Sequence, residues 1–165
     1  MNIVVEIAKD FKNWNKYPEF NPEYFSETVH RILVKYPNFS KVKEFELSIL
    51  LTNDIKMQSL NNEFRGKDEP ANVLSFPDME IDWRKIVEFS VDIEYMYLGD
   101  IAFGYQVVAR EARLKLISFQ DHFKHLLIHA ILHLIGYDHK DEEEAQEMEA
   151  LEIDILNSFG LASPY

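Results

Sequence analysis

The strongest constraint on the fold is the segment from Phe119 to Ile135, where aromatic and aliphatic side chains occupy nearly every turn of a predicted helix. A helix that is apolar on most sides has to pack inside a domain, because little of its surface is compatible with water. Its residues His129 and His133 are four positions apart and therefore lie one helical turn apart on the same face. The segment thus predicts a buried helix with two imidazoles at one place.

A third histidine can join this pair. Gly136 can adopt the positive φ that ends a helix, and the chain can then turn and bring His139 back toward His129 and His133. Three neutral imidazoles form a zinc ligand set that leaves one tetrahedral position open for water, whose pKa falls to roughly 7. We therefore predict one zinc ion per chain, bound by these three histidines. The alternative, local hydrogen bonding on a buried helix, explains the combined spacing, helix and turn less well.

The rest of the chain predicts one α+β domain spanning residues 1–165. The chain has 165 residues, of which 47% are hydrophobic, with no cysteine and therefore no disulfide framework or thiolate metal site. Strands and helices intermingle, which favours a small mixed sheet of about four strands packed with helices. The strands are predicted near 2–7, 43–52, 73–76 and 95–103, and the helices near 23–35, 54–64, 107–116, 119–135 and 141–159.

The second predicted helix and the segment after it have distinct features. Asn53 or Asp54 is predicted to cap the helix, and Gly66 to end it. The apolar residues that we expect to face inward are Ile55, Leu60 and Phe64. Residues 78–94 are acidic and weakly periodic, and we predict a surface excursion without a functional role.

Charge and the N-terminus limit partners and location. The net charge is −12, which repels polyanions and argues against nonspecific binding along nucleic acids. A local basic cleft stays compatible with it, because exposed charges more than about 8 Å apart are largely screened. The first residues lack a basic start and a long apolar run, and no stretch approaches transmembrane length. We expect a soluble cytoplasmic protein without membrane contact.

The histidine spacing is also that of the metzincin metallopeptidases, in which a glutamate follows the first histidine as general base. Here Ala130 occupies that position, and a methyl group cannot accept a proton, so a peptidase is the second-ranked hypothesis. His122 and His125 continue the same face, and we assign them to the cleft wall or to support of the ligands. Asp138 is predicted to orient an imidazole or to cap the following helix.

A second dense segment runs from Leu60 to Pro77 and contains Arg65 at the end of a predicted helix. Arg65 either complements the helix terminus or holds a guanidinium fork toward phosphate oxygens, and the local sequence alone favours the first reading. This segment, Leu98-Gly99-Asp100-Ile101 and the histidine segment ending in Gly136-Tyr137-Asp138-His139 together closely resemble the YbeY family of bacterial ribosomal RNA maturation endoribonucleases. The similarity extends over about residues 47–141.

The resemblance implies an α+β fold, zinc at His129, His133 and His139, and a functional role for Arg65. It also implies cleavage of single-stranded RNA in ribosomal RNA maturation, at the 3′ end of the small-subunit RNA, and in ribosome quality control. Two departures from the family pattern are present. Ala71-Asn72 stands where the family usually has Thr-Asp, and Ala130 stands where it usually has Gly.

The predicted activity is therefore that of a metal-dependent hydrolase, an endoribonuclease. Zinc would polarise a phosphoryl oxygen or supply hydroxide, and Arg65 would stabilise the developing charge. No glutamate neighbours the predicted metal, so the sequence assigns no proton acceptor. The expected partners are single-stranded or ribosomal RNA and the ribosome or its proteins, and not DNA. A further alternative is that the protein is a non-catalytic assembly factor with a structural zinc. Candidates for guiding the RNA backbone are Lys67, Arg110, Arg113 and Lys124.

Overall fold

A mixed four-stranded sheet forms one layer of the molecule. In this computed structural model, which describes residues 1–81 and 91–165, the strand order is β1-β2-β4-β3. Strands β1, β2 and β4 are parallel, and β3 is antiparallel to β4. The strands are β1 (Asn2–Lys9), β2 (Val42–Thr52), β3 (Val73–Pro77) and β4 (Ile93–Gly104). The predicted α+β class and mixed sheet are confirmed, whereas residues 82–90 of the predicted surface excursion lie outside the described residues.

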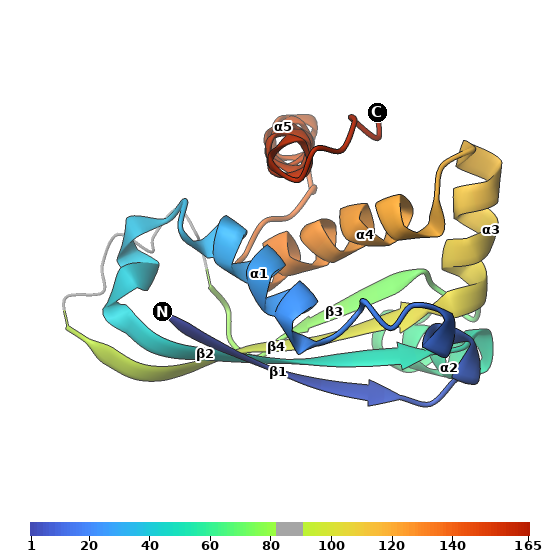
Figure 1. The fold of residues 1–165 in the computed structure, drawn as a ribbon, viewed down its shortest axis with the longest axis horizontal. Coiled ribbons are helices and arrows are strands. Elements are labelled where there is room, and N and C mark those ends of the chain that lie inside the picture. The colour runs from blue at the N-terminus through green and yellow to red at the C-terminus, as the bar shows by residue number, and fades with distance from the viewer. Residues whose placement is uncertain (82–90) are drawn as a thin grey trace.

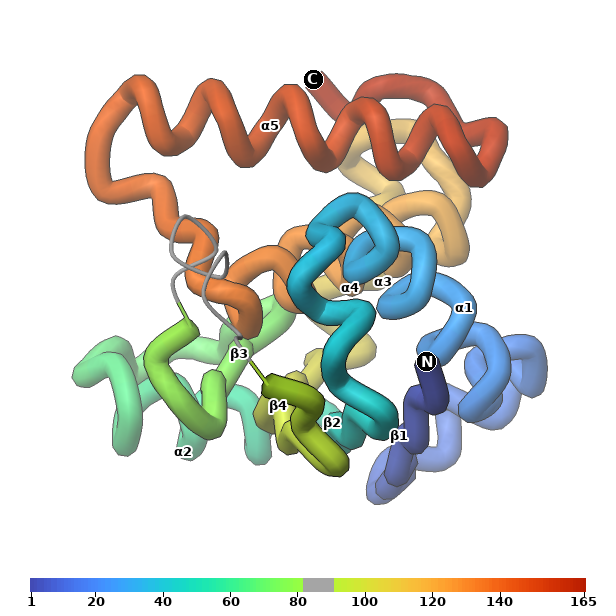
Figure 2. Tube along the Cα trace, turned by 90° about the vertical axis from the view of Figure 1, so that its left-hand side faces the viewer, coloured from blue at the N-terminus to red at the C-terminus, as the bar shows by residue number. Residues whose placement is uncertain are grey.

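The helices form further layers on the sheet. They are α1 (Pro22–Leu33), α2 (Asp54–Arg65), α3 (Tyr105–Lys115), α4 (Phe119–Leu134) and α5 (Glu142–Ser158). Helices α1 and α4 cover one face of the sheet, and α5 lies over α4 on the side away from the sheet (Figures 1 and 2). Helix α4 is therefore enclosed between the sheet, α1 and α5. Within the described residues, no helix is long and apolar enough to cross a membrane.

Aromatic packing fixes the buried end of α4. The side chain of Trp14 is fully buried, and its ring meets the rings of Phe119 and Phe123 edge to face, with centroids 5.7 and 5.6 Å away. Its indole N–H donates to the carbonyl of Thr52 at 3.0 Å, so its polar atom is also satisfied. The helix that the sequence predicts as buried is thus anchored at its N-terminal end by a cluster of aromatic rings.

Local signals in the sequence set several boundaries. Strand β2 buries Phe45, Leu47, Ile49 and Leu51, which confirms the predicted alternation. The side chain of Asn53 caps α2 by accepting the backbone N–H of Lys56 at 3.0 Å. The cap is therefore one of the two residues that the sequence offered.

The inward face predicted for α2 is wrong. Ile55 is 82% exposed and Phe64 is 59% exposed, while Leu60 is half-buried. The residues that α2 buries are Met57 and Asn61, which are four positions apart and share one face. Hydrophobicity alone pointed to the wrong face, because a polar side chain occupies a core-facing position.

The contacts of this face explain why the polar residue is tolerated. Met57 packs with Leu74 of β3 and Ala102 of β4 in a small cluster. Helix α2 lies on the other side of the sheet from α4 (Figure 2). Asn61 donates its amide to the backbone carbonyl of Glu69 at 2.8 Å. A satisfied hydrogen bond offsets much of the cost of burying the amide.

This correction predicts contrasting effects of two substitutions on α2. Met57→Ala removes a fully buried side chain and is expected to lower the free energy of unfolding by about 2–5 kcal/mol. Ile55→Ala, on the exposed face, is expected to change it by no more than about 0.5 kcal/mol. Urea denaturation followed by circular dichroism measures both, and equal losses would contradict the observed orientation of the helix.

Candidate metal centre

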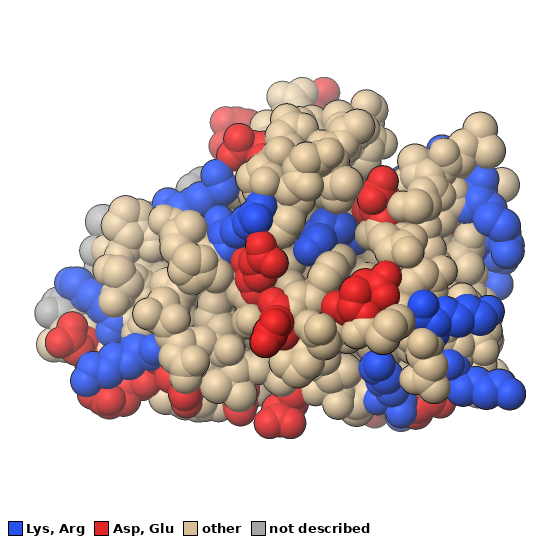
Figure 3. Space-filling view, in the orientation of Figure 1, with Lys and Arg blue, Asp and Glu red and all other residues tan. Residues whose placement is uncertain are grey.

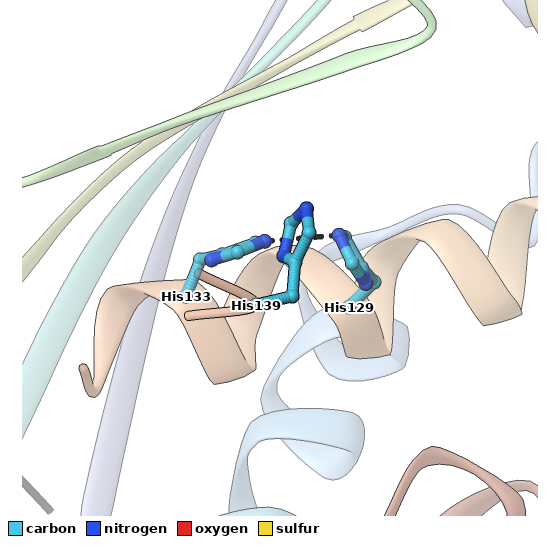
Figure 4. A group of neighbouring side chains, drawn as sticks. All are labelled: His129, His133 and His139. Atoms are coloured by element: carbon cyan, nitrogen blue, oxygen red, sulfur yellow. Dashed lines mark hydrogen bonds between the residues drawn. The ribbon is translucent and has the colours of Figure 1, made fainter. Parts of the chain in front are cut away.

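Helix α4 and the turn after it bring three imidazoles together. His129 and His133 lie on one face of α4, with ring centroids 4.5 Å apart. After the helix ends at Leu134, Gly136 adopts a φ of 104°, and the chain turns back toward this face. The ring centroid of His139 then lies 5.7 Å from that of His129 and 5.2 Å from that of His133 (Figure 4). Nitrogen atoms of the three rings lie within 4.8 Å of one another, so the three histidines selected from the sequence share one site.

Hydrogen bonds on the outer side of the rings determine which nitrogens face the site. Nδ1 of His133 lies 2.8 Å from the carbonyl oxygen of Tyr137, which can only accept, so Nδ1 carries the proton. Nδ1 of His129 lies 2.5 Å from a carboxylate oxygen of Glu152 and donates to it. In the neutral rings, both Nε2 atoms consequently present lone pairs, and these two atoms are 2.9 Å apart. Two facing lone pairs repel unless a proton or a cation lies between them.

Glu152 of α5 is a functional candidate that the sequence analysis missed. Its side chain is 1% exposed and accepts hydrogen bonds from Nδ1 of His129, from Nε2 of His125 at 2.9 Å, and from the hydroxyl of Tyr165. Burial raises the pKa of its carboxyl, but the three hydrogen bonds outweigh burial and lower the pKa to about 2. The expectation that no glutamate adjoins the site is therefore wrong.

The local sequence does not distinguish Glu152 clearly from the other glutamates of α5. Glu152 lies in an acidic amphipathic helix among several other glutamates, and only the packing of α5 on α4 distinguishes it from its exposed neighbours. Glu152 is four positions after Met148 and therefore lies on the buried stripe of α5, and this spacing is the local sequence feature that indicates its burial. The predicted supporting role of His125 is consistent with its bond to the same carboxylate.

The environment keeps His133 neutral. Burial, the largest cause, and the neighbouring His129 lower the pKa of the His133 ring to about 4. At neutral pH its Nε2 therefore carries a free lone pair, as a metal ligand requires. The side chain of His139 is 53% exposed and borders solvent.

The three imidazoles open into a cleft of about 1660 Å³. Arg65, the last residue of α2, lies in its wall, as do β3 and two further basic residues, Lys115 and Lys140. The structure thus brings Arg65 to the same cleft as the histidines, although 64 positions separate Arg65 from His129 in the sequence (129 − 65). This arrangement combines a potential cation site with a guanidinium group.

None of the four basic residues predicted to guide a phosphate backbone lines the cleft. The prediction for Lys124 is wrong, because its side chain is buried, donates to the Thr28 hydroxyl at 2.9 Å and lies over the ring of Tyr24. Arg110 forms an ion pair with Asp54 at 3.2 Å. Neither Lys67 nor Arg113 lines the cleft. On the face drawn in Figure 3, Lys and Arg side chains lie at both ends and across the middle, with acidic side chains between them.

The two positions that depart from the family pattern have defined contacts. Asn72 lines the cleft and donates its amide to Glu111 at 2.9 Å, and Glu111 also pairs with Nε2 of His122 at 3.0 Å. Burial raises the pKa of Glu111, and the bonds from His122 and Asn72 lower it further than burial raises it. Ala130 is fully buried where α4 meets β3, and its carbonyl accepts the hydroxyl of Ser75 at 3.2 Å. The methyl group of Ala130 therefore packs in the interior and supplies no proton acceptor at this position.

Asp138 contacts its neighbour and not the following helix. Its Oδ1 accepts the backbone N–H of His139 at 2.8 Å, which holds the third imidazole in its turn. The N-cap of α5 is Asp141, whose side chain accepts the backbone N–H of Glu144 at 2.8 Å. Of the two roles predicted for Asp138, capping of the following helix is wrong, because Asp141 is the residue that caps α5.

The fold and the cleft define an α+β protein with a potential three-histidine metal centre beside an arginine. Comparison with known proteins is consistent with this class. Residues 10–160 match the family model described as Endoribonuclease YbeY. An Endoribonuclease YbeY from Sphingopyxis alaskensis is 46% identical over 120 residues, which cover 73% of this chain and 71% of that protein.

A solved structure agrees with the fold. The solution structure of TM1509 from Thermotoga maritima superimposes with a TM-score of 0.55 and 23% identity, covering 94% of this chain and 91% of the other. The match to the family model and the identity to the Sphingopyxis protein together establish that this chain belongs to the YbeY family. The resemblance inferred from three sequence segments is confirmed.

The buried environment of His133 predicts an unusual titration. In metal-free protein, the ring is expected to stay neutral at about pH 5.5, where an ordinary histidine with a pKa near 6.5 is mostly protonated. Because the unfolded chain takes up this proton first, the contribution of His133 to stability is present above about pH 6.5 and decreases as the pH falls toward 4. NMR of the imidazole nitrogens measures the titration, and protonation of His133 near pH 6.5 would contradict the structure.

Proposed function

We propose that this protein is a zinc-dependent endoribonuclease that cleaves single-stranded RNA. The observation that carries the proposal is the convergence of His129, His133 and His139 in the cleft that also contains Arg65. Membership of a family named for endoribonucleases supports the reaction class. The donor set supports the metal, because imidazole nitrogens suit zinc and hydrogen bonds fix the tautomers of His129 and His133.

The geometry fits a tetrahedral ion. With Zn–N bonds of about 2.0 Å, two ligand nitrogens lie about 3.3 Å apart. The Nε2 atoms of His129 and His133 are 2.9 Å apart, and small side-chain shifts bridge the difference. Three protein ligands leave one position open, as in catalytic zinc sites.

The residues of the chain have separate roles in this proposal. Zinc in such a site supplies Lewis-acid polarisation of a phosphoryl oxygen and activation of water. Arg65 donates two N–H groups to phosphate oxygens and stabilises the negative charge that grows on them. Glu152 holds His129 in the orientation and tautomer that binds the metal, and Tyr137 does the same for His133 through its carbonyl.

We propose ribosomal RNA as the natural substrate, with processing at the 3′ end of the small-subunit RNA and ribosome quality control as the setting. The motif resemblance supports this assignment. The net charge of −12 supports delivery to RNA through a ribosomal protein, since long-range electrostatics would oppose binding to free RNA. On this account residues 1–165 act as one hydrolase domain in the cytoplasm.

The metal and the reaction are tested together. Purified protein is expected to contain about one zinc per chain and to cleave single-stranded RNA, whereas His133→Ala is expected to lose both, because two imidazoles hold zinc weakly. Metal content by mass spectrometry and gel analysis of a labelled RNA measure the two properties. The exposed residue His30 supplies the control, His30→Ala, which should retain both. Metal-free protein that cleaves RNA at the normal rate would refute the zinc mechanism.

Arg65 is tested by a change that keeps its charge. Arg65→Lys removes the planar fork but retains a cation, and kcat is expected to fall about 100-fold or more with zinc content unchanged. Arg113→Lys is the matched control, because Arg113 is exposed and does not line the cleft. If both variants have equal activity, the phosphate-binding role of Arg65 is refuted, and Arg65 only supplies a positive charge at the end of α2.

Glu152 is tested through metal affinity. Glu152→Gln keeps the shape of the side chain but removes the charge that holds His129, and zinc affinity is expected to fall about 10- to 100-fold. Competition with a chromophoric chelator measures it. Glu149→Gln, on the same helix but exposed, is the control.

The alternatives make different predictions. A metallopeptidase would cleave casein in a chelator-sensitive way, which the absence of a glutamate at position 130 argues against. A non-catalytic assembly factor with a structural zinc would still rescue a deletion strain after Arg65→Lys, although the kcat of the purified variant for RNA cleavage is expected to be about 100-fold lower. Failure of that rescue favours catalysis.

A further inference from the structure

Phe64 is an exposed aromatic residue beside the candidate active site. It directly precedes Arg65 in α2 and is 59% exposed, although large apolar side chains are usually covered. Its ring meets the ring of Phe76 of β3 edge to face, with centroids 5.1 Å apart and an interplanar angle of 64°. One edge-to-face contact leaves most of the Phe64 ring surface open to a ligand.

The two phenylalanines lie where two cavities meet. Both line the cleft that contains Arg65 and the three imidazoles, and both also line a neighbouring groove of about 560 Å³. The groove floor is apolar and is formed by the sheet face that α2 only partly covers, with Leu50 and Ala102 among its residues. An apolar aromatic border of this kind suits a flat ring, whereas the adjacent Arg65 suits a phosphate.

The charges of the groove restrict what can enter it. Glu6 of β1 and Asp100 of β4 line it, and it contains no basic residue among those that the structure describes. A phosphate chain running along the groove would face these carboxylates. A single uncharged base, attached to a backbone that stays near Arg65, avoids that repulsion.

We propose that Phe64 and Phe76 form a stacking subsite for one nucleobase of a single-stranded RNA, next to the phosphate held by Arg65. The proposal rests on the proposed function and names a determinant of substrate binding at the same site. Stacking on an aromatic ring accepts any base, because every base has a flat face. The subsite therefore selects unpaired RNA without selecting a sequence: a base held in a duplex cannot reach Phe64.

The test compares three substitutions at one position in the zinc-loaded full chain. Phe64→Leu keeps an apolar contact with Phe76 but removes the ring, and Phe64→Tyr keeps the ring. On a short single-stranded RNA, Phe64→Leu and Phe64→Ala are expected to raise KM roughly 5-fold or more at nearly constant kcat, and Phe64→Tyr to retain the wild-type value. Ile55→Ala, which is also exposed on α2 but lies outside both cavities, should leave KM unchanged.

A second set of experiments removes the nucleobase from the RNA and leaves the protein unchanged. Abasic sites placed one at a time along the RNA should raise KM for wild-type protein at one position near the scissile phosphate, and should add nothing further in Phe64→Leu. A 2-aminopurine at that position should lose fluorescence on binding to the wild type and keep it with Phe64→Leu. Circular dichroism and melting curves establish that each variant is folded.

The outcomes separate this proposal from the proposed function. If wild-type protein cleaves RNA and Phe64→Leu has the same KM, the stacking subsite is refuted while the nuclease assignment stands; the groove would then be a candidate surface for a basic protein segment. If wild-type protein neither binds nor cleaves RNA, both the stacking subsite and the nuclease assignment are refuted. A KM effect without any abasic-sensitive position also refutes the subsite, because it assigns Phe64 a purely structural role.

Discussion

Helix α4 has almost no face that it can expose to water, and the arrangement of the other elements follows from this constraint. The sheet covers one side of the helix, α1 the next, and α5 the side away from the sheet. The buried or half-buried polar side chains of α4 are those of Lys124 and four histidines. Each of the five has a hydrogen-bond partner. The candidate metal centre thus lies where α4, the most apolar of the helices that the structure describes, carries polar side chains that need partners.

The carboxylate of Glu152 shows how packing and chemistry depend on each other. A buried, ionised carboxylate costs several kcal/mol unless it is fully hydrogen-bonded. Three donors satisfy it here, two from α4 and one from the C-terminal Tyr165. Docking of α5 therefore both closes the domain and fixes the orientation of His129. The same bonds ensure that Nε2 of His129 faces Nε2 of His133, which is the feature that favours a cation at this point.

Much of this arrangement is predictable from the sequence. The spacing of His129 and His133, with Gly136 before His139, predicted a cluster that needs only helix geometry and one left-handed residue. The alternation in β2 likewise predicted its buried face. Such features depend on residues that are close in sequence, where the period of the helix or strand fixes which side chains meet.

The missed features depend on contacts between distant segments. Glu152 is one glutamate among many until α5 packs on α4, and Lys124 looks like a surface charge until Thr28 and Tyr24 enclose its ammonium group. The wrong face assigned to α2 has the same origin, because the hydrogen bond from Asn61 to the Glu69 carbonyl makes a polar residue acceptable in the interior. Hydrophobicity along the chain carries no information about such partners.

The proposed chemistry depends on a zinc ion held by the three imidazoles in the cleft beside Arg65. Zinc-edge X-ray absorption spectroscopy of the purified protein tests it most directly, since the method counts and identifies the ligands. A zinc ion in this site should show three imidazole nitrogens at about 2.0 Å and one oxygen. A spectrum with only oxygen ligands, or with fewer than three imidazoles, would contradict it.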